Sequence, residues 1–108
     1  LLAVPGVASM AELDAALAEG AHLAKLFPST DWSPEQLTSV STPWMPVGGV
    51  DGESVWHWLD AGAWCVGMGT NLCGSDLNDV AEGDGWAENE EQRARDIFME
   101  LQRRRKDA

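Results

Sequence analysis

The stretch that decides the fold is His22-Leu23-Ala24-Lys25-Leu26-Phe27-Pro28. It is short, largely apolar and ended by a proline, which is typical of a buried strand. Three further segments of the same kind lie along the chain, and each of them ends in glycine: Leu1–Gly6, Trp44–Gly49 and Ala63–Gly69. The sequence therefore predicts four short strands at a spacing of about twenty residues.

Helix signals follow the first three predicted strands. Ser9 and Glu12 form a capping box ahead of an apolar stripe with helical spacing. Ser33 is followed by Pro34 at what would be the first helical position, and Asp51 is placed to cap a third helix. Because strands alternate with helices, the fold class is α/β, with parallel strands joined by right-handed crossovers.

The last third of the chain differs in composition from the rest. A polar connection is expected over residues 73–86, followed by a terminal helix over residues 87–105. One face of that helix is apolar, and its members are Ala94, Ile97, Phe98 and Leu101. Four strand–helix units cannot close an eight-stranded barrel, which needs about 250 residues. The chain is then a fragment, one of two associating halves, or an open sheet, and the absence of an initial Met favours the fragment.

Charge and cysteine content exclude several classes of function. The formal net charge is −11, so a nucleic-acid partner is not expected, because phosphate contacts need clustered Lys and Arg. Cys65 and Cys73 are too few for a disulfide framework, and no Cys/His spacing suggests a metal. No apolar run reaches the roughly 20 residues of a membrane span. We expect a cytoplasmic protein without metal or cofactor.

Lys25 is the residue that stands out chemically. It is the only Lys or Arg before Arg93, and strand alternation places it on one face with Leu23 and Phe27. Apolar neighbours desolvate a lysine and favour the neutral amine, the form that attacks a ketone. The alternative is a lysine that reaches solvent or pairs with a nearby acid.

Four segments resemble, in order, motifs of the class I aldolase family that acts on 2-keto-3-deoxy-6-phosphogluconate (KDPG) or 4-hydroxy-2-oxoglutarate. Residues 4–9 resemble its P-G-V-x-[ST] segment, and residues 25–28 resemble its K-x-F-P strand. Residues 46–50 resemble its P-T-G-G-[VI] loop, and residues 62–70 resemble its G-A-x-x-V-G-x-G-[ST] strand. Together they cover nearly the whole chain through about residue 72.

The resemblance implies that residues 1–108 are the last four βα units of a (β/α)₈ (TIM) barrel, a half-barrel fragment of one domain. Lys25 would form the Schiff base with a 2-keto acid that is phosphorylated, and pyruvate and an aldehyde would be released. The implied substrate-binding residues are Phe27, Pro28, Val47, Gly48 and Gly49. The implied phosphate-binding residues are Gly48, Gly49, Gly69 and Thr70, since barrels commonly bind phosphate after strands seven and eight. The full-length family member would be a homotrimer.

Three departures from the family pattern affect this interpretation. Residues 29–33 replace the small, often glycine-containing linker after the family's catalytic strand, and we expect this change to alter the aldehyde side of the pocket. The family's catalytic glutamate and carboxylate-binding arginine lie on early strands that this chain lacks, so the 108 residues alone are predicted to be inactive. Val47 stands where the family usually has threonine, so 4-hydroxy-2-oxoglutarate stays an alternative substrate. Two other functions also stay open: a phosphate-binding barrel isomerase or synthase, and a non-catalytic half-barrel that oligomerises or binds a phosphorylated ligand.

Overall fold

The computed structural model describes residues 1–73 and 86–107. The chain divides into two compact units, Leu1–Gly69 and Thr70–Ala108. Apart from its two end residues, the predicted polar connection at 73–86 lies outside the described residues. Within the described ranges, none of the helices combines the length and the apolar character needed to cross a membrane.

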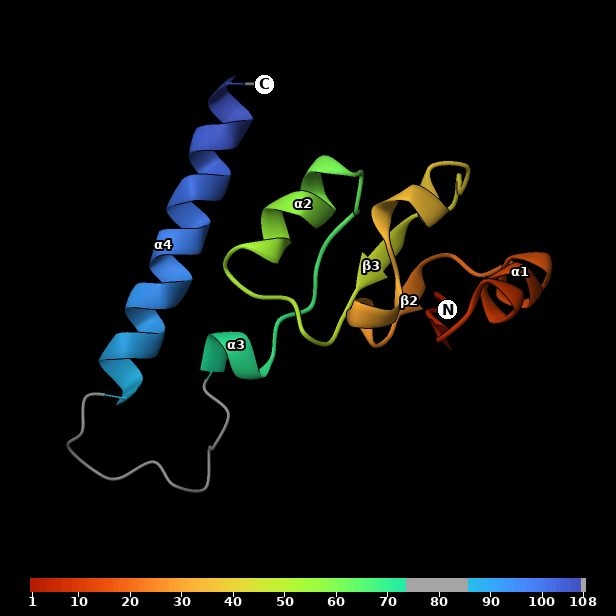
Figure 1. The fold of residues 1–108 in the computed structure, drawn as a ribbon, viewed down its shortest axis with the longest axis horizontal. Helices are drawn as coiled ribbons and strands as arrows, with labels where there is room; N and C mark the ends of the chain where they lie inside the picture. Colours follow the sequence, from red (N-terminus) through yellow and green to blue (C-terminus); the bar gives the residue numbers. More distant parts are fainter. Residues whose placement is uncertain (74–85, 108) are drawn as a thin grey trace. The chain divides into compact units, whose positions relative to one another are not determined.

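The first unit is built on a parallel sheet, as the alternation of strands and helices predicts. Its strands are β1 (Gly6–Val7), β2 (Ala24–Leu26) and β3 (Trp44–Pro46), and they lie side by side in chain order (Figure 1). The register pairs Gly6 with Lys25 and Lys25 with Met45. Each crossover therefore moves the chain to the next position in the same direction across the sheet.

The fourth predicted strand, Ala63–Gly69, is reduced to a single parallel bridge between Val47 and Gly67. The Trp64 N–H donates to Trp44 C=O at 3.0 Å, and the Gly67 N–H donates to Pro46 C=O at 2.9 Å. Residues 44–46 of β3 are thus matched by residues 64–67. The fourth segment carries one residue more than its partner, and such a bulge interrupts a regular ladder.

The first and third predicted helices are present. Helix α1 (Met10–Ala18) begins after Ser9, whose Oγ accepts the Glu12 N–H at 3.2 Å. Glu12 reaches back one residue further than a standard capping box, because its Oε2 accepts the Ala8 N–H at 2.7 Å. Helix α2 (Ser54–Asp60) follows Asp51, whose Oδ1 accepts the N–H groups of Glu53 and Ser54 at 2.9 and 2.7 Å.

The second predicted helix is wrong in type. The chain there forms two short 3₁₀ helices, η1 (Ser29–Asp31) and η2 (Pro34–Leu37). The start signal at Ser33 works as predicted, because its N–H donates to Gln36 Oε1 at 2.7 Å. The next residues, 38–42, are Thr, Ser, Val, Ser and Thr, and β-branched or hydroxyl-bearing residues propagate a helix poorly. Helix formation therefore starts but does not continue.

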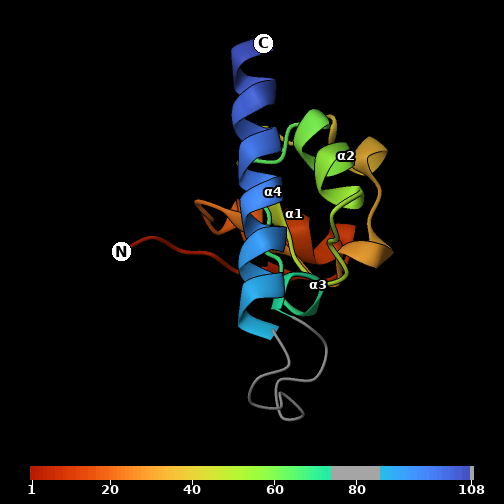
Figure 2. The same ribbon diagram turned by 90° about the vertical axis from the view of Figure 1, so that its left-hand side faces the viewer.

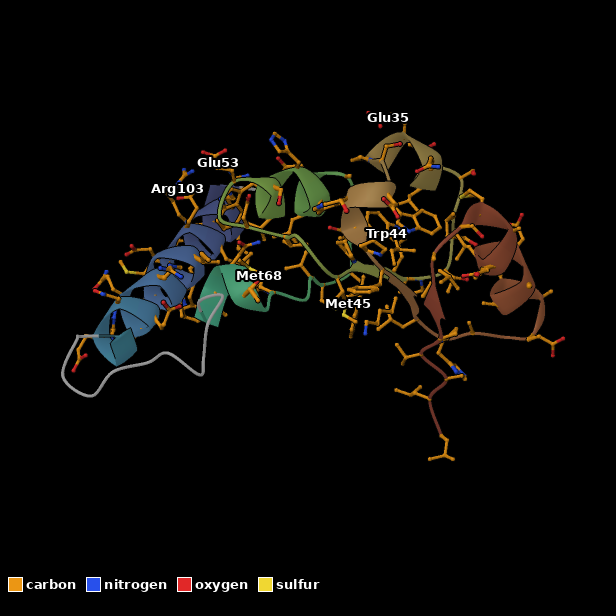
Figure 3. All side chains as sticks on the ribbon, turned by 60° about the horizontal axis from the view of Figure 1, so that its bottom comes forward. Glu35, Trp44, Met45, Glu53, Met68 and Arg103 are labelled. Carbon is orange, nitrogen blue, oxygen red and sulfur yellow. The ribbon has the colours of Figure 1, made fainter. Side chains whose placement is uncertain are left out.

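One face of the sheet is closed by the core. Val7, Leu26 and Trp44 are at most 4% exposed and pack with Leu13 of α1 and Val55 of α2. The rings of Trp44 and Trp58 meet edge to face, with centroids 6.0 Å apart. Figure 3 shows Trp44 and Met45, adjacent on β3, pointing to opposite sides of the strand, as the two-residue period of a strand requires.

The second unit contains α3 (Thr70–Cys73) and α4 (Trp86–Asp107). Helix α3 lies between the predicted fourth strand and the predicted polar connection, and the sequence analysis does not anticipate it. Helix α4 agrees with the predicted terminal helix to within two residues at each end. Glu100 pairs with Arg103 at 2.6 Å and with Arg104 at 3.0 Å. Hydrogen bonds from Arg103, which has the larger effect, and from Arg104 lower the pKa of Glu100 to about 2.

Candidate active site

The candidate site lies on the face of the sheet opposite the core, which we call the open face. It carries Gly6, Lys25 and Met45, which are register neighbours on the three strands, and then Phe27 and Val47, two residues further along the chain. Side chains at paired positions in a parallel sheet point to the same side. Lys25 and Met45 are half-buried, whereas the neighbours of Lys25 on the core face, Ala24 and Leu26, are fully buried.

Lys25 occupies the middle of the central strand. Its Nζ lies 5.6 Å from the centroid of the Phe27 ring, and that ring is itself 52% exposed. Among residues 1–73 and 86–107, no carboxylate lies within ion-pair distance of this amine. Within the described chain, the alternative of a lysine paired with an acid therefore finds no support. An amine beside an aromatic wall is able to act as a nucleophile toward a carbonyl.

A glycine turn follows β3 at the same end of the sheet. Gly48 and Gly49 have φ angles of +87° and +77°, a region that side chains other than glycine rarely occupy. A Cβ on Gly48 would lie 2.7 Å from Cε2 of Phe27, and a Cβ on Gly49 would lie 2.8 Å from Cγ2 of Thr30. The turn therefore needs glycine both for its backbone angles and for the close approach of its neighbours.

The turn is joined to the loop after β2 through Ser29. The Ser29 N–H donates to the carbonyls of Val47 at 2.8 Å and Gly48 at 3.2 Å. Its hydroxyl donates a short hydrogen bond to the Gly48 carbonyl. The Val47 side chain contacts the fourth segment, because a Cβ on Gly67 would lie only 2.8 Å from its Cγ2. Phe27, Val47, Gly48 and Gly49 are thus brought together near Lys25, and half-buried Pro28 joins Phe27 to Ser29.

The remaining phosphate candidates are placed differently. Gly69 is the last residue of the first unit, and Thr70 is the first residue of α3 in the second unit. The phosphate-binding set Gly48, Gly49, Gly69 and Thr70 therefore stays a prediction.

Other reactive side chains of the first unit are less suited to nucleophilic chemistry. Desolvation raises the pKa of the half-buried Cys65 thiol, which disfavours the thiolate. His22 Nδ1 accepts the Ala3 N–H at 3.0 Å and so holds the first residues against β2. Ahead of Ala3, the N-terminal end of the chain extends away from the sheet (Figure 2), and Leu2 is 79% exposed.

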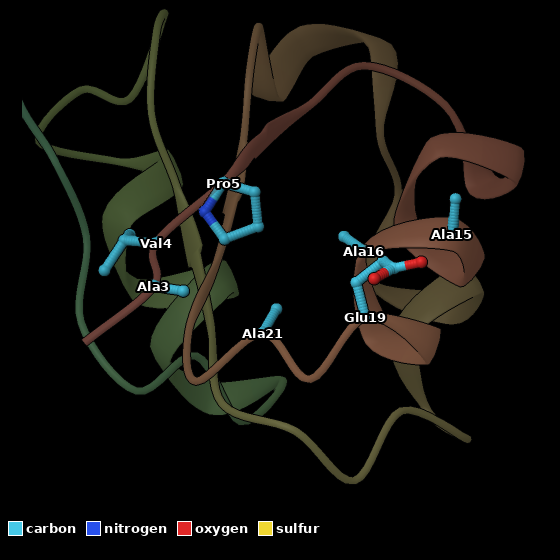
Figure 4. A pocket seen from close by; sticks show the side chains of 7 residues that line it. All are labelled: Ala3, Val4, Pro5, Ala15, Ala16, Glu19 and Ala21. Atoms are coloured by element: carbon cyan, nitrogen blue, oxygen red, sulfur yellow. The ribbon is translucent and has the colours of Figure 1, made fainter. Parts of the chain in front are cut away.

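Two apolar hollows border the first unit. One is lined by alanines, a proline, a valine and a single carboxylate, and its residues are Ala3, Val4, Pro5, Ala15, Ala16, Glu19 and Ala21 (Figure 4). The other lies toward the start of the strands and is lined by Leu2, Val4, His22, Leu23, Pro43 and Trp64. Neither hollow includes Lys25 in its lining.

Met45 and Ser29 belong to the site but are not evident from the sequence. Met45 lies beside Lys25 because of the strand register, and the register cannot be deduced from the sequence alone. Ser29 begins the segment 29–33 that departs from the family pattern, but its bonds to the glycine turn are found only from its burial and contacts. The one available signal for Met45 is its position two residues before Val47, which places both on one face of a strand.

Comparisons with known proteins point to one family, although no protein-family model matches the chain. The 2-dehydro-3-deoxy-6-phosphogalactonate aldolase of Escherichia coli (strain K12) is 35% identical over 75 residues, which cover 63% of this chain and 36% of the aldolase. A native KDPGal structure matches with a TM-score of 0.67 and 28% identity, over 96% of this chain and 49% of that one. A designed cube-shaped, porous protein cage made by fusing symmetric oligomeric domains matches with a TM-score of 0.62 and 26% identity, over 96% of this chain and 40% of that one.

The chain thus spans between a third and a half of the length of the proteins that it matches. The sequence match is to an aldolase, and the structural match to KDPGal extends over nearly all of this chain. On both grounds, the chain is similar to aldolases of the KDPG family.

Proposed function

We propose that the chain supplies the last four βα units of a (β/α)₈ barrel that acts as a class I aldolase. The substrate is a phosphorylated 2-keto acid of the 2-keto-3-deoxy-6-phosphogluconate or 6-phosphogalactonate type. Lys25 forms the Schiff base, and pyruvate and a phosphorylated aldehyde, glyceraldehyde 3-phosphate, are the products. The similarity of the chain to an aldolase in sequence, and to KDPGal in structure, supports the reaction class.

The reaction needs an amine, water, and groups that accept and donate protons. Lys25 Nζ adds to the C2 carbonyl, and the resulting carbinolamine loses water to give an iminium. The electron pair of the C3–C4 bond moves into the iminium, which leaves an enamine, while the C4 hydroxyl gives its proton to a general base from the early strands and becomes the aldehyde. Protonation at C3 and hydrolysis of the imine then release pyruvate and the free lysine.

The observation that carries this proposal is the position of Lys25 on the open face. The amine projects from the centre of the sheet beside Met45 and Phe27, on the side away from the core. A barrel interior would enclose that side, and the apolar neighbours would then exclude water from the amine. Phe27 would form a wall of the pyruvyl pocket.

The glycine turn supports a phosphorylated substrate. Backbone N–H groups of successive glycines make a concave donor set that suits an anion. We assign this role to Gly48 and Gly49, and we place Gly69 at the end of the neighbouring fourth segment as a further donor. Thr70 would add a hydroxyl.

Val47 bears on the choice of substrate. Its side chain offers two methyl groups where the family usually has a hydroxyl, so the keto acid loses one hydrogen bond at this position. We expect the preference between phosphorylated 2-keto-3-deoxy sugar acids and 4-hydroxy-2-oxoglutarate to depend on this residue.

The test is covalent trapping in the complete barrel. Borohydride reduction in the presence of pyruvate should attach one pyruvyl-derived group to Lys25, detected by peptide mass spectrometry. Lys25→Arg and Lys25→Met should lower turnover by about a thousandfold or more, because neither side chain forms an imine. Undiminished turnover by either variant, or an adduct on another residue, would overturn the proposal.

A further inference from the structure

Ser29 is the one residue of polar type that is buried within the described parts of the chain, with 3% exposure. It directly follows Pro28, and it lies under the turn formed by Gly48 and Gly49. Buried hydroxyl groups are costly unless hydrogen-bonded, so the partners of this side chain show what it does.

All the hydrogen bonds of Ser29 with the turn are made to backbone carbonyls. The Ser29 N–H reaches Val47 C=O at 2.8 Å and Gly48 C=O at 3.2 Å, and its hydroxyl also donates to Gly48 C=O. Two consecutive carbonyls after β3 are therefore turned toward Ser29.

The direction of these two carbonyls also fixes the direction of the Gly48 and Gly49 N–H groups. In a trans peptide the N–H points opposite to the C=O of the same plane. Turning the Val47 and Gly48 carbonyls toward Ser29 therefore turns the Gly48 and Gly49 N–H groups away from it. The side opposite Ser29 is that of the fourth segment, because Gly67 bridges to Val47 there.

The neighbours of Ser29 hold the turn in the same place. The Phe27 ring lies against Gly48, and the Thr30 methyl lies against Gly49, at separations that leave no room for a Cβ on either glycine. Phe27, Ser29 and Thr30 all come from the loop that follows the Lys25 strand. The position of the turn is thus set by the end of that strand.

We propose that Ser29 is a positioning residue, which orients the Gly48 and Gly49 N–H groups toward the phosphate of the substrate. This inference rests on the proposed function, since it concerns the phosphate end of the same substrate. The loop after the lysine strand would then contribute both Phe27, which lies beside the amine, and Ser29, which orients the donors for the phosphate. Ser29 itself touches neither the phosphate nor the reacting carbons.

The test compares two substrates in the complete barrel. Ser29→Ala should lower kcat/KM about tenfold for 2-keto-3-deoxy-6-phosphogluconate, mainly through KM, and change it less than twofold for unphosphorylated 2-keto-3-deoxygluconate. Thr30→Val is the matched control, because it removes a hydroxyl one residue away and keeps the methyl against Gly49. It should leave the ratio between the two substrates unchanged.

A merely structural role would give a different result. Equal losses on both substrates for Ser29→Ala, or no loss on either, would overturn the inference. Should Ser29→Ala fail to fold, Ser29→Cys keeps a weak donor of similar size. Its substrate ratio should fall between those of the unsubstituted and alanine proteins, and an unchanged ratio would overturn the inference.

A separate measurement distinguishes failure of this inference from failure of the proposed function. Pyruvate carries no phosphate, so borohydride trapping at Lys25 should be equal in Ser29→Ala and the unsubstituted protein. Titration with inorganic phosphate should shift the amide NMR signals of Gly48 and Gly49 in the unsubstituted protein but not in Ser29→Ala. Loss of trapping in both proteins refutes the aldolase proposal, and the phosphate titration then still decides the role of Ser29.

Discussion

At the scale of single residues, the sequence alone is enough to single out Lys25. It is an isolated basic residue in an apolar strand, and the pattern of seven consecutive residues is enough to recognise that strand. Its surroundings are not local. Met45 lies beside it because β2 and β3 pair in one particular register, and Ser29 matters because of carbonyls some twenty positions away. Pairing and burial are properties of the folded chain, so no local pattern reveals them.

A residue-scale prediction concerns the glycine turn. Gly48→Ala should lower kcat/KM about tenfold in the complete barrel, because a methyl group would collide with the Phe27 ring at a backbone angle that alanine disfavours. Gly52→Ala is the control, since a Cβ there meets nothing within 4 Å. Steady-state kinetics of the two variants would check this. Equal activities would show that the turn has no part in catalysis or binding.

At the scale of elements, the sequence predicts starts better than ends. The caps at Ser9, Ser33 and Asp51 all form, because a cap depends on side chains within three or four residues. The residues after a cap decide whether the helix propagates, and propagation fails after η2. The fourth strand depends on matching its partner residue for residue, and the extra residue between Trp64 and Gly67 breaks that match.

The Asp51 cap gives a prediction about pH. Hydrogen bonds from the Ser54 and Glu53 N–H groups lower the pKa of Asp51 below its usual 3.8. A carboxyl whose pKa is lowered on folding stabilises the fold above its unfolded pKa, and that contribution is lost as the pH falls through the folded value. Asp51→Asn should therefore lower the urea midpoint at pH 7 and have a smaller effect at pH values below 3.8. Asp14→Asn, on the exposed side of α1, should change neither midpoint.

At the scale of the whole molecule, the sheet of the first unit is covered by packed side chains on one face only. Parallel sheets are normally covered on both faces. Here the core face is fully packed, while Val4, Phe27 and Trp64 are 45%, 52% and 67% exposed. This one-sidedness, together with the chain order of the strands, is what supports a place for these units in a larger barrel. A sequence shows the repeat of strand and helix but does not show which face stays open.

We predict that the 108-residue chain alone does not cleave keto acids. A half-enclosed Lys25 keeps access to water, and the first unit offers no second catalytic group on the open face. A coupled assay for pyruvate release should show no rate above background with KDPG. The same assay on the complete barrel is the positive control. Measurable turnover by the isolated chain would contradict the prediction.

The open face links chemistry to assembly. An imine at Lys25 persists best where bulk solvent cannot hydrolyse it, which requires a lid of protein over that side of the sheet. By mass action, any ligand that bonds to the closed form in preference to the open one also favours closure. In the proposed barrel, pyruvate would then be both a product of cleavage and a ligand that stabilises the association of the two halves.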